Sequence, residues 1–371
     1  MLPAVARAAD RFRAEVAARD AKALSEVTRA YASAWAAVRA EGERYARSMA
    51  EEARRLGVPL DEVARANPSW PYQAGRLQGF ADEVAREILA AGGHAGQAIR
   101  GGAQTAGEMG AAHAEALARA GILHGLPAHL AARAERAFGA SWQRVNLAAL
   151  RSLAGALAPG SPVADLLSRY GGIGSARARE ALLRGFVLGS GPRAIARDLR
   201  GATGEALWRA LRLARTEVMR AYRDASGASY QSNPGIVTGW IWSCDLSPRT
   251  CGACLAMDGS RHDAAEALES HPNCRCAMVP ATASYADLAL TLGLPELSSV
   301  PEAVPEAAPR GEAWLAAQSA ATAEAILGPG RARLWRAGMP LDQMVVRTMD
   351  PTWGGGLGLA PLRDLAARAA A

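Results

Sequence analysis

The sequence predicts a mainly α-helical protein with one small α+β module. Three observations support this fold class. Apolar side chains recur at steps of three, four and seven over residues 4–56, alternating β-branched and aromatic residues occupy 236–244, and four of the five cysteines lie between 251 and 276. We therefore expect a long N-terminal helical hairpin or bundle, then an α+β module with a Cys/His zinc site, then a helical C-terminal tail.

Residues 1–125 are predicted to form a long-helix arm. The repeat over 4–56 indicates one helix of roughly 80 Å at a rise of about 1.5 Å per residue. Gly57, followed by Pro59, should end it. A second helical stretch follows the loop "NPSWPY". We expect it to be interrupted at Gly92-Gly93 and Gly101-Gly102, because glycine weakens helix interiors.

Residues 126–204 are predicted to form a helical domain. One amphipathic helix should cover 127–157, carrying Phe138, Trp142, Leu150 and Leu153. Shorter helices should follow at 162–169 and 176–188. A further helix should begin with Pro192 in its first position, capped by Ser190 or Gly191.

The stretch "EALWRALRLARTEVMRAYRDASGASY" opens the α+β module, which we place at 205–281. Its apolar residues share one helix face, and four arginines gather on the opposite face: Arg209, Arg212, Arg220 and Arg223. Such a row is usually a solvated surface, but it could also contact phosphates or an acidic partner. Trp240 and Trp242 indicate a strand, and "CAMVP" indicates a second one.

The remaining chain is predicted to be a linker and a tail. Proline, glutamate and alanine dominate the segment 282–311, which we interpret as a linker. Residues 312–371 should form a helical tail. Within it, "RARLWRAG" and "LDQMVVRTM" are expected as short helices and "DPTWGGGLG" as an irregular segment.

The cysteine window has the spacing of a metal site. Cys251-x-x-Cys254 can bend around one ion, and sixteen intervening residues separate it from His271-x-x-Cys274-x-Cys276. Five candidate ligands are one more than a tetrahedral zinc site needs. Cys251 and Cys254 are the firmest pair. His271 with either Cys274 or Cys276 ranks ahead of the two cysteines alone. A closed zinc site would stabilise a small module with a thin core.

Other polar residues near the window have plainer interpretations. Cys244 lies beside Trp242 and is interpreted as core filler. Asp258 with Gly259 resembles a turn more than a catalytic acid. His262 is interpreted as a solvated loop residue. Four further histidines are scattered and indicate no site: His94, His113, His124 and His129.

Composition narrows the class of partner. The net charge is +6 and Lys22 is the one lysine, so arginine supplies nearly all the positive charge. This favours polyanions such as non-specific double-stranded DNA over sequence-specific reading. The N-terminal residues do not resemble a signal peptide, and no run of 18 apolar residues occurs. We therefore expect no membrane contact and a reducing compartment, where clustered cysteines favour metal binding over disulfides.

Three quoted stretches together resemble the Mu protein F-like family, the minor head or head morphogenesis proteins of tailed bacteriophages. They are "LARTEVMRAYRDASGASY", "GWIWSCDLSPRTCGACLAMDG" and "HPNCRC", and the resemblance is strongest over 205–281. It implies a low-copy structural protein of a phage or prophage head. It also implies association with the portal protein and major capsid protein during capsid assembly and DNA packaging.

The resemblance further implies a location and a ligand set. The protein would occupy the virion, in the capsid interior or at the portal vertex, after assembly in the host cytoplasm. The implied metal residues match at Cys251, Cys254, His271, Cys274 and Cys276. Arg215, Thr216 and Glu217 match the family as well, without an evident role.

Two other classes of function compete with this one. An enzyme could be a metal-dependent hydrolase built on the Cys/His site, with Asp258 or Glu217 as base, or an ADP-ribosyltransferase-like effector using Arg215 and Glu217. The window offers more than three ligands, and no paired glutamate lies near Glu217, so we expect no enzyme. A zinc-ribbon adaptor would need a basic recognition helix after the cysteines, which the sequence lacks.

Overall fold

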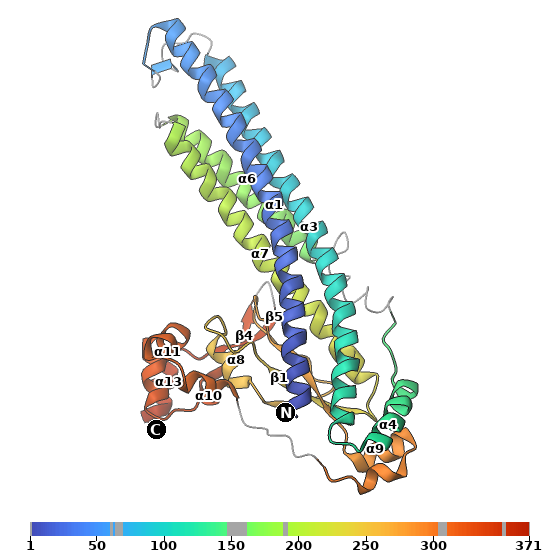
Figure 1. Ribbon diagram of the computed structural model, residues 1–371. Helices are drawn as coiled ribbons and strands as arrows, with labels where there is room; N and C mark the ends of the chain where they lie inside the picture. The colour runs from blue at the N-terminus through green and yellow to red at the C-terminus, as the bar shows by residue number, and fades with distance from the viewer. Residues whose placement is uncertain are drawn as a thin grey trace. The chain divides into compact units, whose positions relative to one another are not determined.

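The computed structural model describes residues 2–59, 62–63, 70–146, 162–187, 192–302, 310–350 and 354–370. The chain divides into two compact units. The first comprises Met1–Asp20, Ala103–Ala154 and Thr216–Ala371, and the second Ala21–Gly102 and Gly155–Arg215. Three of the long helices labelled in Figure 1, α1 (Pro3–Leu56), α3 (Trp70–Leu123) and α7 (Pro192–Gln231), contribute residues to both units. The domain boundaries expected from composition stay a prediction.

The predicted first helix is confirmed as α1, Pro3–Leu56. Gly57 ends it with φ 69°, and the Val58 N–H donates to the Ala53 carbonyl at 3.2 Å. A left-handed glycine followed by this hydrogen bond satisfies carbonyls that the helix would otherwise leave open. Glycine was therefore a reliable stop signal at this position.

Helix α3, Trp70–Leu123, contradicts the predicted interruptions because it runs unbroken through both glycine pairs. A Cβ on Gly92 would lie 3.7 Å from the Leu167 carbonyl oxygen, and one on Gly96 would lie 3.2 Å from the Leu167 side chain. Each glycine costs about 1 kcal/mol of helix propensity. Close packing of α6 against α3 in the second unit offsets that cost at Gly92 and Gly96, whereas a Cβ on Gly93 or Gly101 would meet nothing within 4 Å.

Helix α6, Pro162–Val187, joins two helices that were predicted separately. A Cβ on Gly174 would stand 3.0 Å from the Ala206 Cβ, and one on Gly171 would stand 3.1 Å from the Leu89 side chain. These glycines therefore serve helix packing instead of ending a helix. The core of the second unit is mostly small aliphatic side chains with one aromatic ring: Val38, Phe80, Ala81, Val84, Ile88, Ala178, Ala181, Leu199 and Ala202.

Helix α7 spans Pro192–Gln231, so Pro192 does begin a helix. The proposed caps Ser190 and Gly191 lie outside the described residues. Helix α4 covers Ala128–Ser141, the first part of the predicted 127–157 helix. Leu150 and Leu153 also lie outside the described residues.

The first unit contains a three-stranded antiparallel sheet in the order β2-β1-β3. Its strands are β1 (Val237–Ser243), β2 (Arg261–Asp263) and β3 (Ala277–Thr282). The two predicted strands are confirmed, and β2 was not anticipated. Trp240 pairs with His262 on one side and with Pro280 on the other. The Tyr230 hydroxyl donates to the Met278 carbonyl at 3.0 Å, which fastens α7 to the sheet.

The predicted linker contains folded structure. Helix α9 covers Tyr285–Leu292, and the 3₁₀ helix η3 covers Pro295–Ser299. Ser284 caps α9 by accepting the Asp287 N–H, and Leu288 and Leu297 are fully buried. The first part of the predicted linker is thus a helix packed on the first unit through its apolar residues. Proline and glutamate dominate only the second part of the segment.

The C-terminal tail is helical but also contains a hairpin. Its elements are α10 (Arg310–Ala316), α11 (Ala320–Leu327), α12 (Pro329–Arg336), η4 (Asp342–Met344), β4 (Val345–Asp350), β5 (Gly354–Leu359) and α13 (Leu362–Ala370). Strands β4 and β5 pair where a short helix and an irregular segment were predicted. Valine and threonine in β4 favour an extended backbone, and pairing with glycine-rich β5 satisfies its hydrogen bonds. No helix among the described residues is both long and apolar enough to cross a bilayer.

His113 is a buried polar residue at the contact between three helices of the first unit. Its ring stacks on Phe12 with centroids 3.9 Å apart. Nδ1 lies 3.2 Å from the Tyr222 hydroxyl, and Nε2 lies 3.1 Å from the Glu15 carboxylate. Burial lowers the pKa of His113, and Glu15 opposes part of this shift. The histidine therefore joins α1, α3 and α7, a role that its isolated position in the sequence did not reveal.

The lowered pKa of His113 predicts acid destabilisation. In the unfolded chain His113 would have its ordinary pKa of about 6.5, above its pKa in the folded protein. As the pH falls through about 6.5 the unfolded state therefore binds more protons than the folded state, and the free energy of unfolding decreases. We expect the melting temperature of the wild-type protein to fall between about pH 8 and pH 5. The His113→Gln variant should show a smaller fall, measured by circular dichroism. The matched control is His94→Gln, which changes an exposed histidine on the same helix and should keep the wild-type slope. Equal slopes in all three proteins would contradict this account.

Candidate metal site

The two halves of the predicted site are brought together by the sheet. A connection from Cys244 to Cys251 leads from β1 to the short helix α8, Gly252–Met257, and the "HPNCRC" segment leads directly into β3. Because β1 pairs with β3 up to Ser243 and Ala277, the segments that follow β1 and precede β3 start from adjacent positions. Cys251 is the N-cap of α8, and its Sγ accepts the Cys254 N–H at 3.4 Å.

The five predicted donors fall into two overlapping groups. Cys251, Cys254 and His271 form one, and Cys254, Cys274 and Cys276 form the other, with donor atoms within 4.8 Å in each. His271 Nε2 lies 3.1 Å from Cys251 Sγ and 3.3 Å from Cys254 Sγ. Cys254 Sγ lies 3.8 Å from Cys274 Sγ. Cys254 is thus the common member, and the cluster could hold a metal ion.

Cys244 joins this cluster, although the sequence suggested only a packing role. Its Sγ lies 3.3 Å from Cys276 Sγ and 2.9 Å from the Cys254 carbonyl oxygen. Cys244 is buried, and burial raises the pKa of its thiol well above the ordinary value. The missing signal was strand register, because the pairing of Ser243 with Ala277 places Cys244 and Cys276 opposite each other.

The His271 ring is oriented for ligation through Nε2. Its Nδ1 lies 2.8 Å from the Pro272 carbonyl oxygen, and because a carbonyl can only accept a hydrogen bond, Nδ1–H is the donor. A second hydrogen bond that fixes the ring in this way is common among metal-binding histidines. Burial is the largest single effect on the ring and lowers its pKa, but the hydrogen bond and charge interaction with Cys251, the Pro272 carbonyl and Cys276 together outweigh it, so the pKa of His271 is raised. Protons would compete with a metal ion for Nε2, so metal binding should weaken in acid.

Two sulfurs of the cluster accept backbone N–H groups, but the pKa values of the thiols shift in different directions. Hydrogen bonding from the Cys254 thiol is the largest effect on Cys251, and with His271 it lowers the pKa of Cys251 to about 5. Hydrogen bonding to Cys254 lowers the pKa of Cys274, but hydrogen bonding with Cys276 and burial outweigh it and raise this pKa to about 12. Hydrogen bonds from Cys244, Cys254 and Cys274 lower the pKa of Cys276 well below its ordinary value. The Cys276 N–H points at Cys274 Sγ at 3.5 Å, as the Cys254 N–H points at Cys251 Sγ. Each half of the site therefore contains one sulfur that accepts a backbone N–H.

The predicted arginine row on α7 does not form one solvated face. Arg223 is buried, and its guanidinium donates to the Cys276 carbonyl at 3.5 Å. Arg220 forms an ion pair with Glu217, which is itself buried. Arg212 lies over the Trp208 ring, 5.7 Å from its centroid. Arg223 thus supports the Cys/His segment and is unavailable to a macromolecular partner.

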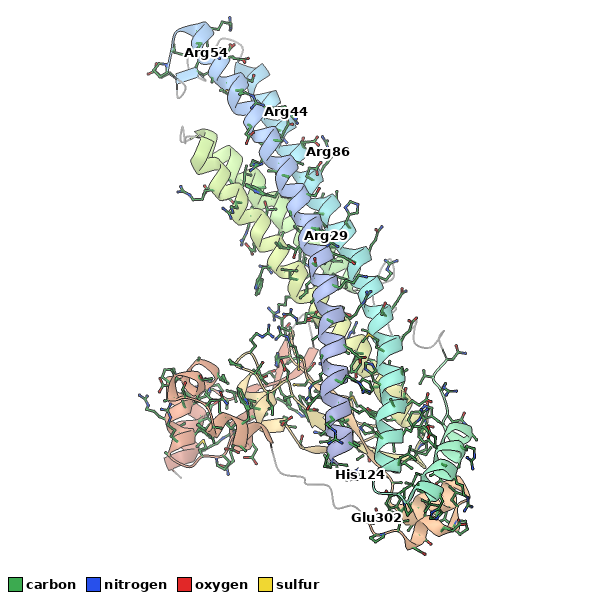
Figure 2. All side chains as sticks on the ribbon, in the orientation of Figure 1. Arg29, Arg44, Arg54, Arg86, His124 and Glu302 are labelled. Carbon is green, nitrogen blue, oxygen red and sulfur yellow. The ribbon has the colours of Figure 1, made fainter. Side chains whose placement is uncertain are left out.

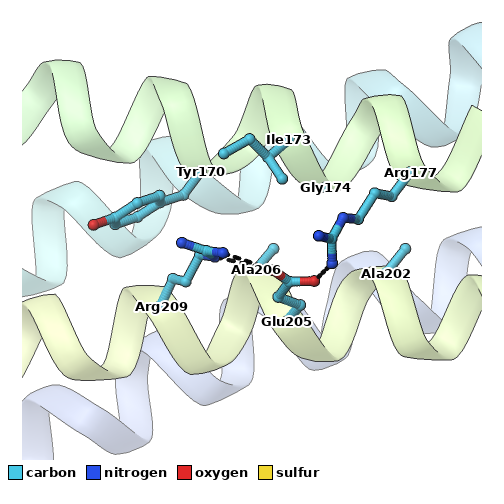
Figure 3. Close-up of a pocket in the computed structure, with 8 residues that line it drawn as sticks. All are labelled: Tyr170, Ile173, Gly174, Arg177, Ala202, Glu205, Ala206 and Arg209. Atoms are coloured by element: carbon cyan, nitrogen blue, oxygen red, sulfur yellow. Dashed lines mark hydrogen bonds and ion pairs between the residues drawn. The ribbon is translucent and has the colours of Figure 1, made fainter.

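Arg209 belongs to an ion-pair network between α6 and α7. Glu205 binds both Arg209 and Arg177, and the Arg209 guanidinium lies 5.5 Å from the Tyr170 ring centroid (Figure 3). The hollow that these side chains line has no interior room for even a water molecule. The network therefore stabilises helix packing and does not form a small-molecule pocket.

The residues considered for catalysis have structural partners. Asp258 is buried and accepts the Cys244 N–H at 2.7 Å, so it joins the end of α8 to the residue that follows β1. Burial raises the pKa of Glu217, and the adjacent Arg220 lowers it in part. The Asp258 carboxylate thus binds the Cys244 backbone, and the Glu217 carboxylate binds Arg220.

One nucleophile and base arrangement was not anticipated. His262 Nε2 lies 2.8 Å from the Ser260 hydroxyl, and His262 Nδ1 lies 3.0 Å from the Glu266 carboxylate. An acyl-transfer site also needs N–H donors for an oxyanion. Here the N–H groups of Gly259 and Ser260 donate to the carbonyls of Trp242 and Met257. Because the His262 ring also stacks on Trp240 at 4.2 Å, the arrangement anchors β2 against β1.

Part of the chain that includes this site is similar to a described family. Residues 176–279 match the family model described as Phage Mu protein F like protein. The match includes all five predicted metal donors and the whole of α7. Neither the curated proteins nor the solved structures contain a match to the chain.

Proposed function

We propose that this protein, in which residues 176–279 match the Phage Mu protein F like family, is a structural minor head protein of a tailed phage or prophage. The observation that carries the proposal is the family match over the segment that holds the Cys/His cluster. In this role the protein acts in capsid and portal assembly and stays in the virion near packaged DNA. Long helices and a compact α+β module suit a protein that connects partners.

We assign the metal as structural zinc. The donors are thiolates and an imidazole, the set that zinc prefers in closed tetrahedral sites. A Zn–S bond of about 2.3 Å puts two sulfurs of a tetrahedron about 3.8 Å apart. The Cys254 to Cys274 distance of 3.8 Å agrees with that spacing. Four protein ligands would leave no open position for a catalytic water, so the ion would supply folding free energy.

We further assign the four ligands as Cys251, Cys254, His271 and Cys274. Cys274 is favoured over Cys276 because its sulfur accepts a backbone N–H in the same way as Cys251. Cys276 Sγ instead lies 3.3 Å from Cys244 Sγ. The spare ligand is then Cys276, which packs beside the ion.

The ligand assignment predicts different outcomes for two neighbouring cysteines. The wild-type protein should bind about one zinc per chain, because one tetrahedral site accommodates one ion. Cys274→Ser should lose most of this metal, whereas Cys276→Ser should keep it. Metal analysis after dialysis measures both, with Cys244→Ala as the control that leaves the four ligands intact. A wild-type content below about half an equivalent would contradict a zinc site. Loss from Cys276→Ser alone would reverse the ligand assignment.

The proposed partners are the portal protein and the major capsid protein. A head protein should co-purify with the portal protein of the same phage when both are expressed together. Imaging of the complex should place added density on the portal or on the inner shell. The control is the same purification with a portal protein from an unrelated phage, which should not retain the chain. Failure to bind either head protein, together with absence from assembled heads, would contradict the proposed function.

We propose that contact with DNA is electrostatic and non-specific. Figure 2 labels arginines along α1 and α3, among them Arg44 and Arg86. These two form ion pairs with Glu41 and Glu83 one helical turn away. Interspersed carboxylates weaken attraction to phosphate, so binding should be modest.

This electrostatic contact predicts strong salt dependence. The protein should retard the migration of duplexes of unrelated sequence at about 50 mM salt and lose most of that binding by about 300 mM. Binding releases counterions from the DNA, and this release is less favourable at higher salt. Gel retardation with two duplexes of different composition measures this. Retardation that is equal at both salt concentrations, or confined to one sequence, would contradict the account.

A further inference from the structure

A hydrogen bond joins α7 to the middle of the "HPNCRC" segment. The Asn273 N–H donates to the Thr216 hydroxyl at 3.1 Å, across 57 residues of sequence. Thr216 lies in the helix, between Arg215 and Glu217. Asn273 lies between two proposed zinc ligands, His271 and Cys274. The helix therefore contacts the turn that sets the spacing of those ligands.

The backbone of this turn has an unusual conformation. Asn273 has φ 68°, the one positive φ among the described residues other than glycine. Asparagine tolerates this left-handed region better than most residues. The Cys274 N–H donates to the His271 carbonyl at 3.2 Å and closes the turn. Because the left-handed residue reverses the chain, its N–H points away from the turn and toward Thr216.

A second side chain of α7 supports the same segment. Arg223 lies seven residues after Thr216, which is about two helical turns and so the same face. Its buried guanidinium donates to the Cys276 carbonyl at 3.5 Å. One face of α7 therefore contacts the backbone at Asn273 and at Cys276, on both sides of Cys274.

We infer that Thr216 is a positioning residue for the metal site, acting through the Asn273 backbone. It would hold the left-handed turn so that His271 Nε2 and Cys274 Sγ face Cys254 before the ion arrives. This gives Thr216, the middle residue of the Arg215-Thr216-Glu217 motif, a role that the sequence did not reveal. The inference rests on the proposed zinc site and is independent of the proposed role in the phage head.

The test compares zinc affinity in matched variants of the full chain. Thr216→Val keeps the β-branched shape and removes the hydroxyl, so zinc affinity should fall about 10- to 100-fold, as for other residues that orient metal ligands. Thr216→Ser should restore wild-type affinity. Competition with a chromophoric chelator measures the affinity. Absorption of the cobalt-substituted protein should keep its charge-transfer intensity, because all ligands remain.

A second pair of variants tests the turn itself. Asn273→Gly should keep wild-type zinc affinity because glycine adopts positive φ freely, whereas Asn273→Ala should weaken it. Wild-type affinity in both Thr216→Val and Asn273→Ala would overturn the inference. So would an equal loss of thermal stability in Thr216→Val with and without zinc, because that pattern indicates helix packing alone. A wild-type protein that binds no zinc would instead refute the zinc site, and this inference with it.

Discussion

The cluster of sulfur atoms around Cys254 is the constraint on which the α+β module depends. It joins the start of α8, the segment before β3 and the residue that follows β1. Few regular hydrogen bonds hold these segments, since α8 has six residues and β2 has three. The residues between β2 and β3 include no regular helix or strand. Trp240, Trp242 and the buried cysteines belong to an apolar core that the module shares with residues of α3, α4 and α9. A metal ion would add a cross-link between the short segments around this core.

The long helices pack against one another through few large side chains. Alanine and glycine at the helix contacts let backbones approach closely, which recovers dispersion energy that bulky side chains would otherwise supply. Gly110 is the clearest case, since a Cβ there would lie 2.2 Å from the Tyr222 carbonyl oxygen. The buried His113 sits one helical turn away and adds directional contacts to this packing. Close approach and one polar network thus fix the pairing of α3 with α7.

Sequence patterns predicted those features that depend on local chemistry. The 54-residue helix α1 and its stop at Gly57 follow from periodicity and glycine conformation alone. The same reasoning failed inside α3 and α6, because whether a glycine ends a helix depends on what packs against it. The β4-β5 hairpin was missed because Val345 and Val346 also fit a short helix, and only pairing decides between the two. In the metal site, spacing identified five donors, but the place of Cys244 and the contact between Thr216 and Asn273 depend on tertiary structure.

The edge of the sheet has a consequence for behaviour at high concentration. Strand β3 lies at an edge in the order β2-β1-β3, and Pro280 occupies its interior. Proline has no N–H, so the row of donors along this strand is incomplete and makes a poor template for another chain. The strand on the other edge, β2, has only three residues. Copies of this module brought close together are therefore protected from joining strand to strand into insoluble aggregates.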